Sequence, residues 1–238
     1  EGSGQAATAE QLEAESRWFG NVQARAHRRD LKLQLAAPVL AALRELLAAV
    51  GGCLGGIVTP DAELCELSAL VADPGAAAQA LHPDTQIAPG NDHAGLCTAF
   101  LALQDVDPSM GPTEVCPRSH GAAAHAALSA DPRLGDAPRA ADGWGPAQPA
   151  LLSAGDVLLM DSRAWHRGGA NTSQARRVLL YLTFRVPGNA PLGSTYSLLD
   201  EYQGRFRLSR VERWADSTAV AHAGPATVAP MTTMGDSS

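Results

Sequence analysis

The sequence predicts a mainly β protein whose double-stranded β-helix (jelly-roll) core is buttressed by N-terminal α-helices. Apolar residues at helical spacing are confined to the first fifty positions, and short strand-like segments separated by turn signals follow from about residue 64. The 238 residues suffice for one well-buried domain. Short strands with turns between them, preceded by helices, are typical of a double-sheet jelly roll.

Two helices are expected in residues 1–52, the segment that should pack on the core. Thr8 and Gln11 form a capping box that opens the first helix. Pro38 suits the first turn of the second helix, residues 39–50, which a glycine pair should end. The leucines at helical spacing that should be buried against the core are Leu40, Leu43, Leu46 and Leu47.

The jelly-roll domain is predicted to span residues 53–214. An Asp-Pro-Gly turn at 73–75 and a Gly-Pro turn at 111–112 separate its strands. An Ala-, Pro- and Gly-rich insert at about 121–148 is expected to be loop or short helix over the mouth of the domain. The low-complexity tail, 215–238, has a disordered composition unless it lies along the domain or a protein partner holds it. The predicted strands are 66–72, 76–84, 94–106, 113–116, 157–161 and 178–185.

Charge and composition argue against several classes of function. The net charge of −7 disfavours general nucleic-acid binding, which requires basic surface against phosphates. The basic cluster Arg25, Arg28 and Arg29 is interpreted as a solvated helix face. No uninterrupted apolar run reaches the roughly 18 residues of a membrane span, so a soluble protein without a transmembrane segment is expected. The chain begins at Glu1, and both the compartment and the removal of an organelle-targeting peptide stay open.

The most informative feature is a set of two histidines and one carboxylate suited to a shared metal ion. His82 and Asp84 are two residues apart, so in an extended segment their side chains point to the same side. His166 follows the predicted strand 157–161, at a position where a side chain can project into the mouth of a barrel. Two imidazoles and one carboxylate with open positions opposite them are the ligand set of non-haem Fe(II) oxygenases.

Five short motifs stand in a fixed order around these residues. They are Ala-Leu-Gln-Asp-Val at 102–106, Met-Gly-Pro-Thr at 110–113, Pro-Arg-Ser-His-Gly at 117–121, Gly-Asp-Val-Leu-Leu-Met at 155–160, and Asn-Thr-Ser at 171–173 before an arginine pair. In this order they resemble the phytanoyl-CoA dioxygenase (PhyH) family of Fe(II)- and 2-oxoglutarate-dependent oxygenases. The resemblance covers about half of the chain, residues 66–185, and the ordered series is far more specific than any one motif.

The resemblance implies a role for each candidate residue. His82, Asp84 and His166 correspond to the iron ligands and so to the catalytic centre. Arg177, eleven residues past the distal histidine, corresponds to the arginine that holds the far carboxylate of 2-oxoglutarate by bidentate contact. Arg176 is its rival, because adjacent residues of a strand point to opposite sides and only one of the pair can face inward.

One position departs from the family pattern. The family commonly has a polar residue soon after the distal histidine that helps to bind 2-oxoglutarate, and Gly168 occupies that neighbourhood here. Thr98, Ser173 or Tyr181 would then have to serve, and the sequence leaves the choice among them open. Phe100 corresponds to an aromatic wall of the cosubstrate pocket, or is simply a core residue.

The resemblance implies Fe(II) and 2-oxoglutarate as cofactors, ascorbate as an accessory reductant, and a small or lipid-like substrate. Related halogenases lack the carboxylate ligand, so the presence of Asp84 favours hydroxylation of an unactivated C–H bond over halogenation. Two alternatives stay open. One is a non-catalytic binding or structural subunit on the same fold, and the other is a cupin-type metalloenzyme that does not use 2-oxoglutarate.

Overall fold

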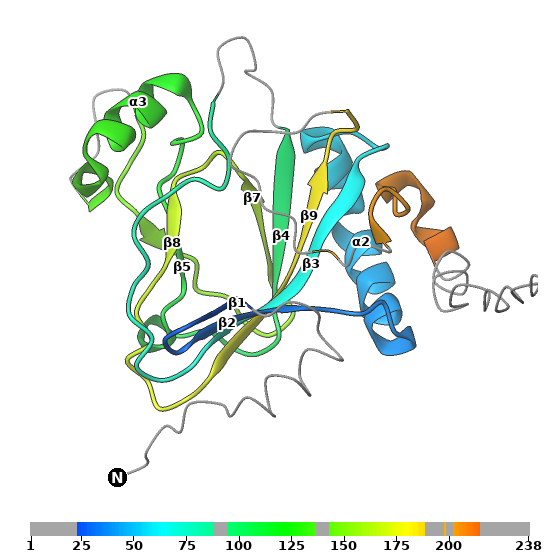
Figure 1. Cartoon of the computed structure of the whole chain (residues 1–238), viewed down its shortest axis with the longest axis horizontal. Coiled ribbons are helices and arrows are strands. Elements are labelled where there is room, and N and C mark those ends of the chain that lie inside the picture. Colours follow the sequence, from blue (N-terminus) through cyan, green and yellow to red (C-terminus); the bar gives the residue numbers. More distant parts are fainter. Residues whose placement is uncertain (1–22, 88–94, 137–142, 189–197, 199–201, 215–238) are drawn as a thin grey trace, which may run out of the picture.

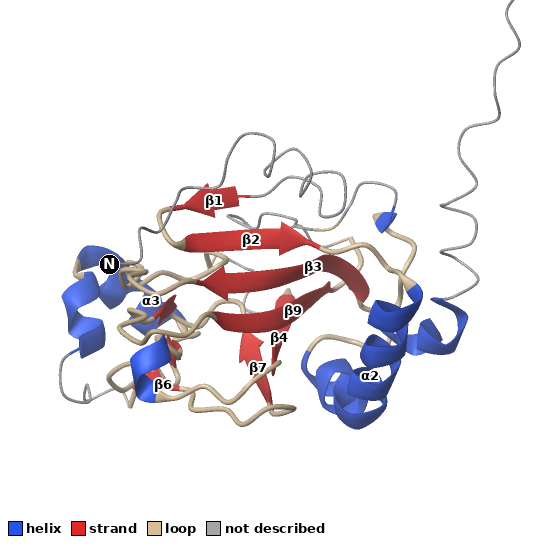
Figure 2. Ribbon diagram, turned by 90° about the horizontal axis from the view of Figure 1, so that it is seen from below, coloured by secondary structure: helices blue, strands red, loops and turns tan. Residues whose placement is uncertain are grey.

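The computed structural model describes residues 23–87, 95–136, 143–188, 198 and 202–214, which form two antiparallel sheets and a few helices (Figures 1 and 2). The larger sheet has the strand order β1-β2-β3-β9-β4-β7, and the smaller sheet has the order β6-β5-β8. The bounds are β1 Gln23–Arg25, β2 Arg28–Lys32, β3 Glu63–Ala72, β4 Leu96–Ala102, β5 Thr113–Val115, β6 Gln148–Pro149, β7 Val157–Asp161, β8 His166–Gly168 and β9 Arg177–Arg185. The helices are α2 Ala37–Ile57 and α3 Ala122–Ala130, with 3-10 segments at Pro108–Met110, Pro132–Asp136 and Leu208–Arg213.

The larger sheet is covered on both faces. Leu67, Leu182 and Ala99 stand on one rung of β3, β9 and β4, and they share a core cluster with the leucines of α2. Side chains alternate along a strand, so the neighbouring residues point the other way. That inner face looks toward the smaller sheet, while α2 covers the outer face (Figure 1). Coverage on both faces explains why these strands are apolar almost throughout.

Helix α2 confirms one prediction and corrects two others. Pro38 lies in its first turn, as expected, and the buried leucines are Leu40, Leu43, Leu46, Leu47 and Leu54. The helix does not end at the glycine pair but continues to Ile57, because packing of its leucine stripe on the sheet outweighs the weak helix propensity of glycine. Its length and composition also suffice for a membrane span, contrary to expectation. One such helix is weak evidence, and a stripe packed on a sheet is the pattern of a core helix.

The described segment before α2, residues 23–36, is not helical. Its residues form the hairpin β1–β2, which extends the sheet because β2 pairs with β3, so that Arg28 faces Ala72 and Arg29 faces Val71 across the strands. The basic cluster therefore belongs to a sheet edge and not to a helix face. The predicted helix at Thr8 and the tail 215–238 lie outside the described residues.

Residues 76–84, predicted as a returning strand, form no ladder. The segment is held at single points, where Gln79 N donates to the Gly168 carbonyl and His82 pairs with His166 in an isolated bridge. The predicted strand 157–161 is present with the same bounds as β7, and the remaining predicted strands are present with shifted ends. The insert contains α3, and the predicted domain division after residue 52, which stays a prediction, falls inside α2.

Two glycines should respond in opposite ways to alanine. Gly52 lies in α2, and a Cβ added to it would have no other atom within 4 Å, so Gly52→Ala should stabilise the fold by about 0.5–1 kcal/mol. Gly111 has φ +69°, and a Cβ there would clash with the Gly169 carbonyl oxygen, so Gly111→Ala should destabilise by more than about 2 kcal/mol. Urea unfolding measures the change in free energy of unfolding for each variant. A loss of stability in Gly52→Ala would contradict the open space beside this glycine.

Candidate metal centre

His82, Asp84 and His166 lie together, and their candidate ligand atoms are all within 4.8 Å of one another. The two histidines face each other across an antiparallel bridge, with N–O distances of 3.0 and 2.8 Å. Asp84 Oδ1 is 3.6 Å from His166 Nε2 and 3.9 Å from His82 Nε2. Two segments of the chain, one with His82 and Asp84 and the other with His166, therefore bring three candidate ligand atoms to one place.

Hydrogen bonds set the orientation of both imidazole rings. Nδ1 of His82 lies 2.7 Å from the Ala80 carbonyl oxygen, and Nδ1 of His166 lies 2.9 Å from that of Ala164. A carbonyl only accepts, so each Nδ1 is assigned as the protonated donor, which leaves the Nε2 lone pairs directed toward Asp84. A backbone contact of this kind is the usual outer support of a metal-binding histidine.

The carboxylate is positioned by its backbone. The amide groups of Asp84 and Thr85 both donate to the Ser162 carbonyl oxygen, at 3.0 and 3.1 Å. The Ser162 hydroxyl is 3.2 Å from that of Thr98, which is 2.9 Å from that of Thr183. Ser162 directly follows β7, so the chain that leads toward His166 also anchors Asp84.

Two adjoining cavities open at the triad. One, about 370 Å³, includes Arg28 and Arg177 and is called the basic chamber here. The other, about 300 Å³, includes Glu66 and Asp84 and is called the acidic chamber. Residues that line both are Asp30, Leu70, Gln79, His82, Phe100 and His166. Phe100, which the sequence left as either a pocket wall or core, is a wall of both chambers.

The structure separates the two adjacent arginines. Arg177 is 2% exposed and lines the basic chamber, where its Nη1 donates to the Gly111 carbonyl at 2.7 Å. Its Nε is buried and has no hydrogen-bond partner among the described residues. Burial first, and then the charge of Arg28, lowers the pKa of Arg177 to about 10. Arg176 is exposed on the opposite side and pairs with Asp73. A buried, partly unpaired guanidinium indicates a place for an anion.

Arg28 and Gln79 are chamber residues that sequence reasoning missed. Gly168 is two residues past His166 in β8, so a side chain there would point to the same side as the histidine. A Cβ on Gly168 would lie 2.8 Å from Arg28 Nη1 and 2.7 Å from Gln79 Oε1. Polar groups from two other segments thus fill the place where the family commonly has a polar side chain. The pairing of β2 with β3, which brings Arg28 here, has no local signal.

Three residues were candidates to assist at the cosubstrate. Thr98 lines the acidic chamber, with its hydroxyl bonded to those of Ser162 and Thr183. Tyr181 also lines that chamber and donates to Asp30 Oδ2 at 2.9 Å. The structure does not bring Ser173 to either chamber, because its hydroxyl donates to Asn171 Oδ1 and serves the turn before β9.

Within the described ranges, no second cluster of His, Cys, Asp or Glu has metal-ligand spacing. His125 is buried, and its Nε2 lies 2.6 Å from the Arg163 carbonyl oxygen.

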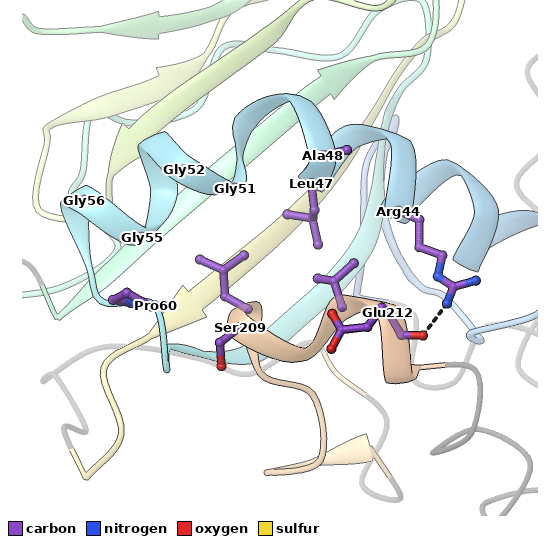
Figure 3. Close-up of a pocket in the computed structure, with 12 residues that line it drawn as sticks. Arg44, Leu47, Ala48, Gly51, Gly52, Gly55, Gly56, Pro60, Ser209 and Glu212 are labelled. Carbon is purple, nitrogen blue, oxygen red and sulfur yellow. Dashed lines mark hydrogen bonds between the residues drawn. The ribbon is translucent and has the colours of Figure 1, made fainter.

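A larger cavity, about 720 Å³, lies between α2 and the segment Leu208–Arg213 (Figure 3). Gly51, Gly52, Gly55 and Gly56 form its floor on α2. Arg44, at one end, donates to the backbone carbonyl of Glu212. This cavity is mainly apolar, and Glu212 is the one carboxylate among its described lining residues, whereas the described cluster of three potential metal ligands lies at His82, Asp84 and His166, so the size of this cavity does not make it the site of chemistry.

Glu66 should make stability depend on pH. Burial first, and then the charges of Asp84 and Asp30, raise the pKa of Glu66 to about 8, although a hydrogen bond with Thr183 lowers it. The unfolded chain releases this proton at about pH 4.3, so from there to about pH 8 the native state holds more protons and stability falls as pH rises. In metal-free wild-type protein, Glu66 should therefore lower the free energy of unfolding on the order of 2–4 kcal/mol across this pH range, and Glu66→Gln should abolish that decrease.

Urea unfolding between pH 5 and 8.5 measures this difference, with Glu45→Gln on the exposed side of α2 as the matched control. Parallel stability curves for wild type and the Glu66→Gln variant would show that Glu66 is not protonated in the native state.

Two antiparallel sheets, with a His-Asp-His cluster and a buried arginine beside one cavity, define the class of jelly-roll metalloproteins. The family model described as "Phytanoyl-CoA dioxygenase (PhyH)" matches residues 5–179. The chain therefore belongs to the PhyH family of Fe(II)- and 2-oxoglutarate-dependent oxygenases, which confirms the resemblance noted in the sequence.

Solved structures agree with this fold. The non-heme alpha ketoglutarate dependent epimerase SnoN from nogalamycin biosynthesis is 16% identical, with a TM-score of 0.53, covering 79% of this chain and 93% of that one. HygX from Streptomyces hygroscopicus, with nickel and 2-oxoglutarate bound, is 18% identical, with a TM-score of 0.53, covering 79% and 85%. EvdMO1 is 25% identical with a TM-score of 0.49, and the match covers 65% of this chain but only 34% of that protein. The jelly-roll prediction is supported, whereas the expected set of N-terminal helices is not confirmed.

Proposed function

We propose that this protein is an Fe(II)- and 2-oxoglutarate-dependent dioxygenase that hydroxylates an unactivated C–H bond of a small molecule. One observation carries the proposal: the ligand atoms of His82, Asp84 and His166 converge at the edge of a cavity that also holds the buried guanidinium of Arg177. Membership of the PhyH family supports it.

His82, Asp84 and His166 would hold the iron. The Nδ1 hydrogen bonds of both histidines to backbone carbonyls leave Nε2 as the atom that would bind the ion, and the Asp84 carboxylate would offset part of the charge of a divalent ion. When bound, iron with 2-oxoglutarate supplies the activation of O2 coupled to oxidative decarboxylation. The presence of a carboxylate at Asp84, where related halogenases leave room for chloride, is the reason to propose hydroxylation.

Arg177 would hold the far carboxylate of 2-oxoglutarate, and Arg28 would add a second positive charge. β2 and β9 flank β3, and Arg28, Ala72 and Arg177 stand on one rung, so the two arginines are about 10 Å apart at their Cα atoms. Burial lowers the pKa of both guanidinium groups, and ion pairing with a bound dicarboxylate would offset the cost of burying their charges. Phe100 would wall this pocket against water. Thr98 would position Asp84 through Ser162.

Anaerobic loading with Fe(II) and then with 2-oxoglutarate tests the function directly. The expected results are a charge-transfer absorption band on addition of the 2-oxo acid, and slow, iron-dependent formation of succinate after O2 and ascorbate are admitted. A protein that binds the metal but gives neither the band nor succinate would contradict the proposal. The cupin-type alternative predicts metal binding without 2-oxoglutarate binding.

Arg28→Gln should weaken 2-oxoglutarate binding by about tenfold, because one charge-assisted contact to a carboxylate is lost. Arg28→Lys, which keeps the charge, should retain more of the affinity than Arg28→Gln does. The dissociation constant is measured by titration of the charge-transfer band, with the exposed Arg205→Gln as control. Equal affinities for wild type and Arg28→Gln would remove Arg28 from the cosubstrate pocket.

A further inference from the structure

Charged residues stand at successive rungs along the inner face of the larger sheet, and Lys32, opposite Ser68, lies between the rungs of Asp30 and Glu66. Arg28 and Arg177 stand on the rung at one end of β2, β3 and β9. Asp30 stands on the next inward-facing rung, where it is paired with Leu70. Glu66 stands two rungs further on, opposite Thr183. The alternation of side chains along paired strands therefore places Arg28 and Arg177 at the basic chamber and Glu66 at the acidic chamber, whereas Asp30 lines both.

The lining of the acidic chamber includes three carboxyl groups, on Asp30, Glu66 and Asp84, and no lysine or arginine among its described residues. Asp84 is committed to the metal in the proposed function. Asp30 accepts a hydrogen bond from Tyr181 and lies near the charge of Lys32. Glu66 is left with the Thr183 hydroxyl as its neighbour and, within the described part of the chain, has no basic partner.

A carboxyl group enclosed without a counter-cation is costly, and here burial raises the pKa of Glu66 to about 8. A cation brought by a ligand would remove that cost by forming an ion pair. A ligand carboxylate or phosphate would find no cationic side chain among the described residues of the acidic chamber, and would be attracted to the arginines of the basic chamber instead. The two chambers thus sort an anionic ligand from a cationic one.

We propose that the acidic chamber binds a protonated amine of the substrate and that Glu66 is the residue that pairs with it. This inference rests on the proposed function for the identity of the neighbouring metal and cosubstrate. The substrate is then an amine-bearing small molecule and not a lipid-like one. The volume of about 300 Å³ suits a small amine or the amine-bearing end of a larger molecule.

Three probes of similar shape test the charge preference: cyclohexylammonium, cyclohexanol and cyclohexanecarboxylate. Each is titrated by calorimetry into protein loaded anaerobically with Fe(II) and 2-oxoglutarate. The ammonium should bind about tenfold more tightly than the alcohol, because the hydrogen bond gains a charge at both ends. The carboxylate should bind more weakly than the alcohol.

Glu66→Gln should reduce the preference for ammonium over alcohol to about twofold or less, whereas Glu66→Asp, which keeps the charge, should retain a preference. Glu45→Gln on the exposed side of α2 is the matched control and should behave as wild type. The proposal is overturned by equal binding of ammonium and alcohol, by no binding of the ammonium, or by an undiminished preference in folded Glu66→Gln protein.

The titrations are repeated on metal-free protein, where the acidic chamber can be tested by itself. If the loading experiment shows no binding of metal or 2-oxoglutarate but the metal-free protein still prefers the ammonium, the proposed function is contradicted and the amine site is supported. Intact metal and 2-oxoglutarate signals without the preference would contradict only the amine site.

Discussion

Replacement of His166 by alanine should lower iron-dependent succinate formation on the order of a thousandfold, the largest effect expected for any single substitution in this chain. The His166 side chain is 8% exposed and its Nε2 lies 3.6 Å from Asp84, so removal of the ring takes away one of three candidate ligands at the most enclosed corner of the site. The bound-iron stoichiometry should fall in parallel, which elemental analysis after anaerobic loading measures.

His120 provides the matched control, because it is an exposed histidine that lines neither chamber. His120→Ala should keep both the iron stoichiometry and the rate of succinate formation. Full activity in folded His166→Ala protein would show that the triad is not the metal centre. Loss of activity with iron still bound would instead point to a role for the imidazole other than ligation.

Arg177→Gln should weaken 2-oxoglutarate binding by about a hundredfold, whereas Arg176→Gln should leave this binding unchanged. Loss of a buried charged contact to a carboxylate typically costs about 2–5 kcal/mol. The Arg177 guanidinium lines the basic chamber and keeps its Nε free of partners among the described residues. Arg176 is exposed and pairs with Asp73, so Arg176→Gln should bind 2-oxoglutarate as wild type does.

The stability of the ligand-free protein separates a binding role of Arg177 from a structural one. Burial lowers the pKa of Arg177, so its charge is costly when no anion is bound, and Arg177→Gln should lose little stability without 2-oxoglutarate. Saturating 2-oxoglutarate should then stabilise the wild type more than the variant, as thermal unfolding shows. Equal 2-oxoglutarate affinity in Arg176→Gln and Arg177→Gln would contradict the assignment.

Local patterns predicted several elements correctly because their cause is local. The leucine stripe of α2 follows from helical spacing, and Leu40 and Leu43 are buried as expected. The Asp-Pro-Gly turn places Gly75 at φ +86°, a conformation that glycine adopts without strain. The spacing of His82 and Asp84 brings both side chains to one side of an extended segment, although that segment is not a strand.

The wrong predictions share a different cause. The sequence predicts a helix face for Arg25, Arg28 and Arg29, but Arg28 and Arg29 lie in β2, whose partner β3 is some forty positions further along the chain, and no local pattern encodes such a pairing. Residues 76–84 were assigned to a strand, but their backbone bonds go singly to β8 and to the residues that follow β7. The glycines of α2 predicted an end to the helix that packing on the sheet overrides.

Residue types and their order predict the candidate chemistry of this protein: two histidines, a carboxylate, a distal arginine and the family to which their order belongs. The enclosure of these groups depends on contacts between distant parts of the chain. Strand pairing brings Arg177 and not Arg176 to the basic chamber and places Arg28 and Gln79 beside Gly168, and it sets Glu66 in a chamber whose described lining has no lysine or arginine. The physical reason is that a ligand set is written in residue types and short spacings, whereas the walls of a cavity come from strands paired across the whole chain.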